Sequence, residues 1–166
     1  MLTLRQETVD DIPGIRKVVY AAFGRAGEAD LVDALRASGS LVLSAVATID
    51  DRIVGHVGYS PMVIGEQHEA VALAPVAVSP ECQRQGIGAA LVRWSLEECR
   101  RMGHRLVIVL GEPEYYGRFG FTPAATCGIE CPFPAPSEAF MMLELAPGAA
   151  RDVCGVVRYR PEFNAV

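Results

Sequence analysis

The sequence predicts an α/β (α+β) fold that occupies residues 1–166 as a single domain. Three observations predict it. Residues 41–78 form β-rich runs separated by short polar turns, as in an antiparallel meander. Residues 87–102 repeat apolar side chains at helical spacing, and residues 106–110 are almost wholly apolar, as in a strand buried on both faces. With 51% hydrophobic and 21% charged residues, the chain can bury a proper core.

The first forty residues are predicted to hold one strand and two helices. Residues 2–5 suit a short strand, and Thr8 or Asp10 can cap the helix that follows. Pro13 fits only the first turn of this helix, where no intrahelical N–H is lost. A second helix is expected over residues 29–37.

The predicted meander has strands over residues 41–49, 52–63 and 70–78, and Pro75 lies inside the third. A proline cannot donate a ladder hydrogen bond, so it is confined to sheet edges and bulges. Because residues 106–110 have the composition of a central strand, the strand that carries Pro75 is not expected at an edge. We therefore expect a bulge at Pro75, where two central strands diverge.

The C-terminal third is predicted to be irregular between its strands. A short helix is expected over residues 115–119, ended by Gly120. Residues 122–137 are rich in proline and glycine and read as a long loop, and loops of this length tend to be functional or mobile. Residues 139–145 and, more weakly, 155–159 have the composition of strands.

The stretch from Val76 to Leu91 reads as a strand, a turn, a glycine-bearing loop and the start of a helix. A helix start leaves about four backbone N–H groups without intrahelical partners, and the helix dipole adds positive charge there. Gly86 and Gly88 would let a phosphate approach the backbone closely. An ordinary strand-to-helix connection has the same pattern. A P-loop is excluded because no Lys follows either glycine, and the dinucleotide fingerprint fails because Leu91 stands where a small residue is needed.

The remaining pattern, Gln-x-x-Gly-x-Gly from Gln83 to Gly88, resembles the acetyl-CoA motif of the GNAT N-acetyltransferase superfamily. A second block, Tyr115 to Phe121, resembles the Tyr-x-x-x-Gly-Phe element of the same superfamily and is similar to small bacterial acetyltransferases with a Tyr-Tyr-Gly-Arg-Phe-Gly-Phe block. The resemblance implies a mixed, mostly antiparallel central sheet of about six to seven strands, splayed at a bulge and flanked by about four helices. It also implies that the two N-terminal helices form a substrate-side lid, in which Arg25, Glu28 and Asp30 either contact a substrate or are simply solvated.

The resemblance implies an acetyl-CoA-dependent N-acetyltransferase, in which a primary amine attacks the thioester directly. The residues expected to bind acetyl-CoA are Val76, Ala77 and Val78 on the strand and Arg84, Gln85, Gly86, Ile87, Gly88 and Ala89 at the helix start. The strand would hydrogen-bond the pantetheine arm as an added strand. Tyr116 matches the position that the family uses for proton return to the sulfur, although an aromatic core residue is the structural alternative. No metal is expected.

The general base is not assigned by the sequence. Many relatives place a carboxylate on the strand before the short helix and an Asn after it, but residues 106–110 carry no acid and Gly111-Glu112-Pro113 replaces the Asn region. The candidates are Glu66, His68, Glu69, Glu112, Glu114 and His56. A base that acts through water stays open.

Charge and cysteine content limit the partners and the compartment. A net charge of −5 argues against a general nucleic-acid binder, so attraction for coenzyme A must be local. The N-terminal residues lack the apolar core of a signal peptide, and no uncharged run is long enough to span a bilayer, so a cytoplasmic protein without a membrane partner is expected. The five cysteines are expected to be free thiols.

Two other classes of function compete with the enzyme. One is a non-catalytic acyl-CoA-binding sensor or regulatory protein, which the presence of Tyr116 disfavours. The other is a structural module that binds no coenzyme A. The amine acceptor is left open between a small molecule and a peptide, and the oligomeric state between a monomer and a homodimer.

Overall fold

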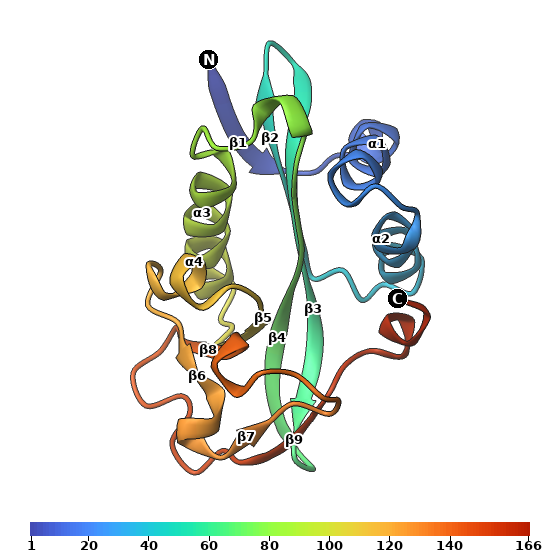
Figure 1. Ribbon diagram of the computed structural model, residues 1–166. Helices are drawn as coiled ribbons and strands as arrows, with labels where there is room; N and C mark the ends of the chain where they lie inside the picture. Colours follow the sequence, from blue (N-terminus) through green and yellow to red (C-terminus); the bar gives the residue numbers. More distant parts are fainter. The chain divides into compact units, whose positions relative to one another are not determined.

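The computed structural model describes all residues from 1 to 166 (Figure 1). Its helices are α1 (Ile12–Phe23), α2 (Gly27–Ala37), α3 (Ile87–Arg101) and α4 (Pro113–Gly117). Its strands are β1 (Leu2–Gln6), β2 (Leu43–Ile49), β3 (Arg52–Ile64), β4 (His68–Val78), β5 (Leu106–Leu110), β6 (Thr122–Pro123), β7 (Ile129–Glu130), β8 (Phe140–Glu144) and β9 (Gly155–Arg158). No helix combines the length and the apolarity that crossing a bilayer requires.

The chain forms two compact units that are interleaved in sequence. The first unit comprises Met1–Ser60, Ala74–Glu97 and Pro161–Val166, and the second comprises Pro61–Leu73 and Glu98–Arg160. The long strands β3 and β4 and the helix α3 therefore contribute residues to both units.

The first unit is built on the antiparallel pairs β1–β2 and β2–β3. Its helices lie on both faces of these strands, with α1 and α2 on one side and α3 on the other (Figure 1). On the first face, an apolar cluster joins Ile15 and Val19 of α1, Val32 of α2 and Val46 of β2. On the second face, the Tyr59 hydroxyl of β3 and the Ser95 hydroxyl of α3 lie 2.7 Å apart in a buried hydrogen bond.

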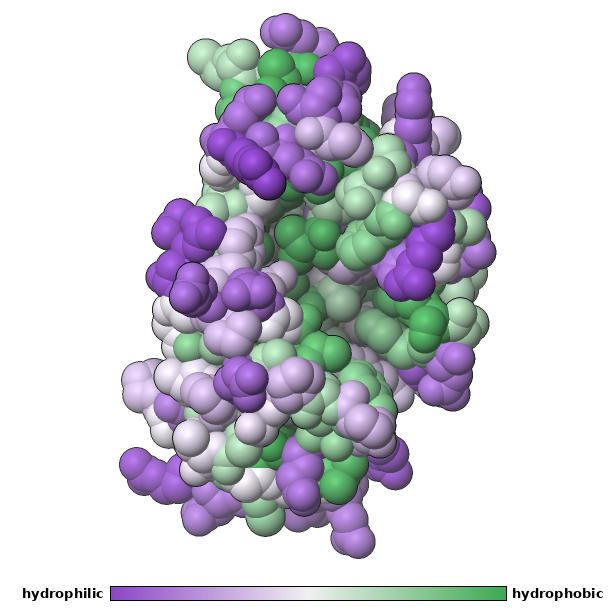
Figure 2. All heavy atoms as spheres, in the orientation of Figure 1, coloured by the Kyte–Doolittle hydropathy of each residue, from purple (hydrophilic) through white to green (hydrophobic).

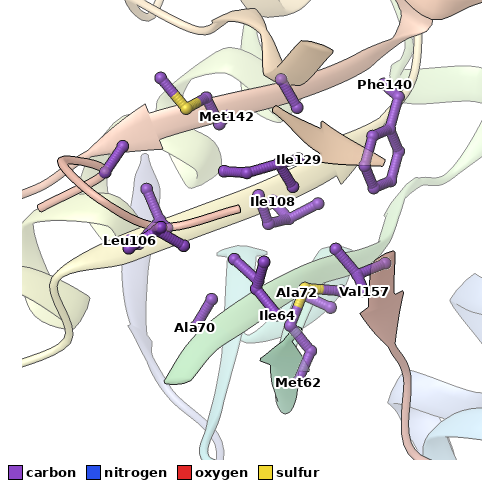
Figure 3. Packing of buried hydrophobic residues seen from close by; sticks show 13 residues of the cluster. Met62, Ile64, Ala70, Ala72, Leu106, Ile108, Ile129, Phe140, Met142 and Val157 are labelled. Carbon is purple, nitrogen blue, oxygen red and sulfur yellow. The ribbon is translucent and has the colours of Figure 1, made fainter. Parts of the chain in front are cut away.

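The second unit has β5 between β4 and β8, parallel to the first and antiparallel to the second. Its core gathers Ile64, Ala72, Ile108, Phe140 and Met142 from these strands and from β3 (Figure 3). The short strand β6 pairs with β8, and β9 pairs with both β3 and β7. The central place of β5 explains why residues 106–110 are apolar on both faces.

The predicted fold class is confirmed. The chain is a mixed α/β protein with four helices and an open, mostly antiparallel sheet, in which seven strands follow one path and β7 and β9 lie off it. The parallel pairs are β4–β5 and β7–β9.

The parallel β4–β5 ladder ends before Pro75, and the expected divergence of the two strands there stays a prediction. The β4–β5 ladder consists of Val71↔Val107 and Ala72↔Ile108, so it ends before the Ala74–Pro75 peptide bond, which is cis. On its other side, β5 pairs with β8 at all five of its residues. Pro75 thus follows the point where the parallel pairing stops, while the bulge at Pro75 stays a prediction.

Some expected elements differ from the structure in their bounds or their content. The short helix α4 runs over Pro113–Gly117 rather than 115–119, because Pro113 suits a first helical turn and the preceding Glu112 is extended. The helix α2 begins at Gly27 rather than Ala29. The expected loop over 122–137 contains β6, a 3₁₀ turn at Ala124–Cys127 and β7. A strand of two residues is too short to show a periodic pattern in the sequence. β6 and β7 are strands because they pair with β8 and β9.

Candidate active site

The loop between β4 and α3 turns sharply and presents backbone at its surface. The Ser79 N–H donates to the Val54 carbonyl at 2.8 Å at the end of β4, and the Cys82 N–H donates to the Ser79 carbonyl at 2.8 Å. Arg84 and Gly86 then adopt the left-handed conformation, with φ of 64° and 83°. A Cβ at Gly86 would meet no atom within 4 Å, so the space in front of this backbone is open.

The start of α3 supplies amides without intrahelical partners. The first bond into the helix runs from the Ala90 N–H to the Gly86 carbonyl at 3.0 Å, so the amides of Ile87, Gly88 and Ala89 come before the first intrahelical donor. The side chains of Ile87 and Ala89 are buried, which fixes the helix end, while Gln85 and Gly86 are exposed. In Figure 2, the part of the first unit that carries this loop and the β2–β3 turn shows many hydrophilic residues with apolar ones between them.

The strand that leads into the loop has backbone outside the β4–β5 ladder. The last β4 residue that pairs with β5 is Ala72, and Val76, Ala77 and Val78 follow it in the chain. The Val78 carbonyl accepts a hydrogen bond of 3.0 Å from the Gln83 side-chain amide. The motif glutamine therefore ties the loop back onto the strand, a structural role that the spacing alone did not indicate.

The ring of Tyr116 is held by packing. Its ring lies against Gly111, where an added Cβ would come within 2.3 Å of Tyr116 Cε2. It also makes edge contacts with Tyr115 and Phe121, at centroid distances of 5.0 and 5.7 Å. Burial raises the pKa of the Tyr116 hydroxyl to about 12, and Tyr115 adds to the shift. The hydroxyl is therefore protonated at neutral pH.

The neighbouring Tyr115 has a different setting. The Arg118 guanidinium carbon lies 4.2 Å from the centre of the Tyr115 ring, and Arg118 Nε donates to the Tyr115 carbonyl at 3.1 Å. The contacts of Tyr115 and Tyr116 therefore differ, although the sequence Tyr-Tyr does not distinguish the two residues.

Five of the six candidate bases lie at or near the surface. Glu66, Glu69, Glu112 and Glu114 are exposed, and His68 is half-buried. His56 differs from all of them because it is completely buried in β3. Burial lowers its pKa from 6.5 to about 4, and although Glu7 opposes this shift, the ring is neutral at physiological pH.

His56 ends a chain of polar groups that runs from the buried Ser44 to the half-buried Glu7 and Arg36. Its Nε2 lies 2.8 Å from the Ser44 hydroxyl, which donates to the Glu7 carboxylate. The carboxylate also accepts two hydrogen bonds from Arg36, at 2.8 and 2.9 Å. Burial alone would raise the pKa of Glu7, but the hydrogen bonds from Arg36 and Ser44 lower it, so Glu7 is ionised.

This chain fixes the tautomer of the His56 ring. An ionised carboxylate can only accept, so the single proton of the Ser44 hydroxyl is committed to Glu7. The Ser44 oxygen must then accept from His56, which places the ring proton on Nε2. The His56 Nδ1 consequently carries a lone pair, and it is a buried atom without a hydrogen-bond partner. Sequence reasoning missed Glu7, Ser44 and Arg36, and the one available signal was a serine inside the apolar run of β2.

The charged residues of the expected lid are engaged in ion pairs. Arg25 pairs with Glu28 at 2.5 Å, and Glu28 is buried. Arg16 of α1 bridges to Asp30 at 2.9 Å and Asp33 at 2.7 Å in α2. Simple solvation is therefore the wrong description of Glu28, whose pKa the Arg25 guanidinium lowers.

The structure distributes the expected site residues over the two units. The loop, the start of α3, Val76–Val78 and His56 belong to the first unit. Tyr116, together with the candidate carboxylates Glu112 and Glu114, belongs to the second. All five cysteines are free, and no group of three or more potential metal ligands gathers in the chain.

Comparison with known proteins agrees with this geometry. Residues 3–124 match the family model of the acetyltransferase (GNAT) domain. The chain is 38% identical over 165 residues to the uncharacterized N-acetyltransferase YhbS of Escherichia coli K12, covering 98% of this chain and 99% of the relative. It is 40% identical over 134 residues to the uncharacterized N-acetyltransferase YjhQ of the same organism, covering 77% of this chain and 74% of the relative.

Solved structures give the same result. The crystal structure of Escherichia coli YhbS in complex with CoA has a TM-score of 0.94 at 37% identity, covering 98% of this chain and 92% of that one. A GNAT family acetyltransferase from Brucella melitensis in complex with acetyl-CoA has a TM-score of 0.82 at 35% identity, covering 98% of both chains. Sequence and structure therefore agree that this chain belongs to the GNAT acetyltransferase family.

Proposed function

We propose that this protein is an N-acetyltransferase that moves the acetyl group of acetyl-CoA to a primary amine. Membership of the family supports acetyl transfer, and the bound CoA and acetyl-CoA of the two similar structures support the donor. The observation that carries the proposal is the open backbone at Gly86 in front of the start of α3.

The pyrophosphate of the donor binds at this helix start in our proposal. A net charge of −5 gives no general attraction for a polyanion, so the attraction is local. The amides of Ile87, Gly88 and Ala89 and the positive end of the α3 dipole provide it. Arg84 adds a guanidinium that is exposed and takes part in no ion pair of the chain. The pantetheine arm then pairs with the backbone of Val76, Ala77 and Val78.

The reaction proceeds by direct attack in this proposal. The lone pair of the neutral amine forms a bond to the thioester carbonyl carbon, and the carbonyl electrons move to oxygen. When the tetrahedral intermediate collapses, the C–S bond breaks and its electron pair leaves with sulfur. The nitrogen loses one proton to a base or to solvent, and the thiolate gains one to become the thiol of coenzyme A.

Tyr116 is the proposed general acid toward the CoA thiolate, to which its hydroxyl donates a hydrogen bond. Its raised pKa keeps the hydroxyl protonated, as a donor requires, but makes a complete transfer to a thiolate unfavourable, because a thiol has a pKa of about 8.5. The contribution of Tyr116 therefore lies in a hydrogen bond that strengthens as negative charge develops on sulfur. Solvent completes the protonation of the thiolate.

Thermal unfolding with and without acetyl-CoA tests the donor site. At a ligand concentration one hundred times its dissociation constant, acetyl-CoA is expected to stabilise the fold by about 2.7 kcal/mol. Gly86→Glu is expected to abolish this stabilisation, because the side chain fills the open space and its carboxylate repels a phosphate. Gly39→Glu is the matched control, since Gly39 also has a positive φ, of 73°, and open space around its Cβ position.

Both variants strain the backbone by about 1–2 kcal/mol, so both lose similar stability without ligand. Only the Gly86 variant should lose the response to acetyl-CoA. An unchanged ligand-induced shift in folded Gly86→Glu would refute the proposed donor site.

A further inference from the structure

The second unit contains a cavity that the proposed donor site does not use. It has a volume of about 290 Å³ and lies under the loop that precedes β8. Its lining includes Ile129, Glu130, Cys131, Phe133, Ser137 and Phe140. The size is near the lower end of the range for small-molecule sites, which is roughly 300–1,000 Å³.

The apolar walls of this cavity are held in place. Ile129 and Phe140 belong to the core cluster of the second unit and are 0% and 3% exposed (Figure 3). Phe133 is 45% exposed, yet its ring stacks on Tyr159 at a centroid distance of 6.1 Å. The cavity is therefore preformed and presents two aromatic rings and an aliphatic side chain to a ligand.

The charge of the lining has one sign. Glu130 is its carboxylate, and no Lys or Arg lines the cavity or occurs between residues 131 and 139. Glu130 takes part in no ion pair or side-chain hydrogen bond of the chain. A single unpaired carboxylate beside aromatic rings favours a single positive charge, through an ionic hydrogen bond and cation–π attraction.

We propose that this cavity binds a compact monoamine with an apolar or aromatic body, such as an arylalkylamine. The volume excludes large polycationic compounds, the single carboxylate gives no second anchor for a polyamine, and the sign of the charge disfavours anionic ligands. That the bound amine is the acetyl acceptor rests on the proposed function, whereas its binding does not.

Site-specific alkylation of the native protein tests the proposal. The half-buried thiol of Cys131 lines the cavity, and the exposed thiol of Cys154 does not, so Cys154 is an internal reference. Phenethylamine is expected to slow alkylation of Cys131, read by peptide mass spectrometry, and to leave Cys154 unchanged. Phenethyl alcohol and phenylacetate have the same body with no charge or the opposite charge, and they should protect poorly.

Glu130→Gln should weaken protection by phenethylamine about tenfold or more, as expected for the loss of a charged hydrogen-bond partner. Glu138→Gln is the matched control, because it removes the same charge from the same loop at an exposed position outside the lining. Equal protection by the alcohol or the acid, no protection of Cys131, or full protection in Glu130→Gln would overturn the proposal.

The acetyl-CoA thermal shift separates this proposal from the proposed function. If acetyl-CoA stabilises the protein while phenethylamine leaves Cys131 unprotected, the cavity proposal alone fails. If phenethylamine protects Cys131 while acetyl-CoA gives no shift, the amine site stands and the proposed donor chemistry fails.

Discussion

At the scale of single residues, His56 shows how a chain of polar groups determines a protonation state. The ring is fully buried, its Nε2 is bound to Ser44, and its Nδ1 has no partner. A buried acceptor without a donor costs about 1–3 kcal/mol. Protonation of Nδ1 would add a charge to the same dry environment, so the native state resists it.

The pH dependence of stability follows from this resistance. The pKa of His56 is about 4 in the folded protein and 6.5 in the unfolded chain, so between these values the unfolded chain binds more protons. Above pH 6.5 the ring is neutral in both states, and the unfolding free energy is not reduced by this effect. As the pH falls from 6.5 toward 4, protonation of the ring in the unfolded chain lowers the unfolding free energy. The full effect corresponds to about 3 kcal/mol of unfolding free energy. The hydrogen bond from Arg5 lowers the pKa of Asp11 from 3.8 to about 2. The contribution of Asp11 to the unfolding free energy is therefore lost at lower pH, as the pH falls from 3.8 toward 2.

We predict that the His56 ring stays neutral and Nε2-protonated down to about pH 5. Long-range ¹H–¹⁵N spectra of the imidazole ring read both the tautomer and the titration. The unfolding free energy, measured in urea, should fall between pH 6.5 and 4.5, and His56→Gln should flatten this dependence. A ring proton on Nδ1, or titration of His56 near pH 6.5, would contradict the derived hydrogen-bond chain.

Tyr116 gives a second prediction at this scale. Tyr116→Phe keeps the ring and its contacts with Gly111 and Phe121, so stability should barely change. Turnover at saturating acetyl-CoA should fall by about 100-fold, at the lower end of the range for a general acid, because the raised pKa limits proton transfer.

Tyr115→Phe is the matched control and should keep most of the activity. Acetyl-CoA binding, followed by thermal shift, should be unchanged in both variants. A larger loss of turnover in Tyr115→Phe would show that the wrong tyrosine was chosen, and no turnover of any amine by the parent protein would favour the acyl-CoA sensor.

At the scale of elements, α4 and the turn before it form one packed unit. Gly111 comes directly after β5, and the Tyr116 ring occupies the space where its side chain would be. The Tyr116 N–H donates to the Glu112 carbonyl at 3.0 Å, which anchors the backbone of the same residue. The orientation of the ring therefore depends on the absence of a Cβ at position 111.

We predict that Gly111→Ala displaces the Tyr116 ring, because the new Cβ would lie 2.3 Å from Cε2. Stability should fall by about 1–3 kcal/mol, the usual cost of overpacking, and turnover should fall nearly as far as in Tyr116→Phe. Gly117→Ala is the control, since a Cβ there meets nothing within 4 Å and lies in the same helix. It should stabilise the protein by up to about 1 kcal/mol.

Chemical denaturation and turnover assays of the two variants check this prediction. Full activity in Gly111→Ala would mean that the position of the Tyr116 ring is unimportant for the reaction.

The elements that the sequence predicted are those with long local patterns. The helix α3 and the strands β2 to β4 lie within about two residues of their expected bounds, because in each of them seven or more residues follow one local pattern. The two-residue strands β6 and β7 have no period to read. They exist because residues distant in sequence pair with them.

In the candidate site, too, the features that depend on residues close in sequence could be predicted and the others could not. The loop before α3 could be predicted because its chemistry depends on close spacing from Gln83 to Gly88. The left-handed φ of Arg84 could not be, since a side chain at that position is disfavoured. The Glu7–Arg36 pair could not be predicted either, because 29 residues separate its members. The cavity beside Glu130 depends on a fold of the loop that its composition does not specify.

At the scale of the whole molecule, the chain crosses repeatedly between its two compact units. It passes from one to the other after Ser60, Leu73, Glu97 and Arg160. Two of these crossings lie inside the long strands β3 and β4, and a third lies inside α3. Neither unit is a continuous segment, so neither can complete its own strands without the chain of the other.

We predict from this interleaving that the protein unfolds as a single cooperative domain. The strand β2 lies wholly in the first unit and β8 wholly in the second, and each is paired on both sides. Pulsed hydrogen exchange across a urea series should therefore give the same midpoint for peptides from β2 and β8, and fluorescence of Trp94 should give that midpoint as well. If β8 lost protection at a clearly lower urea concentration than β2, the second unit would be an independent unfolding unit. The parts of β3 and β4 in the second unit, after Ser60 and before Ala74, would then unfold while the parts in the first unit stay folded. The single-domain description would be wrong in that case.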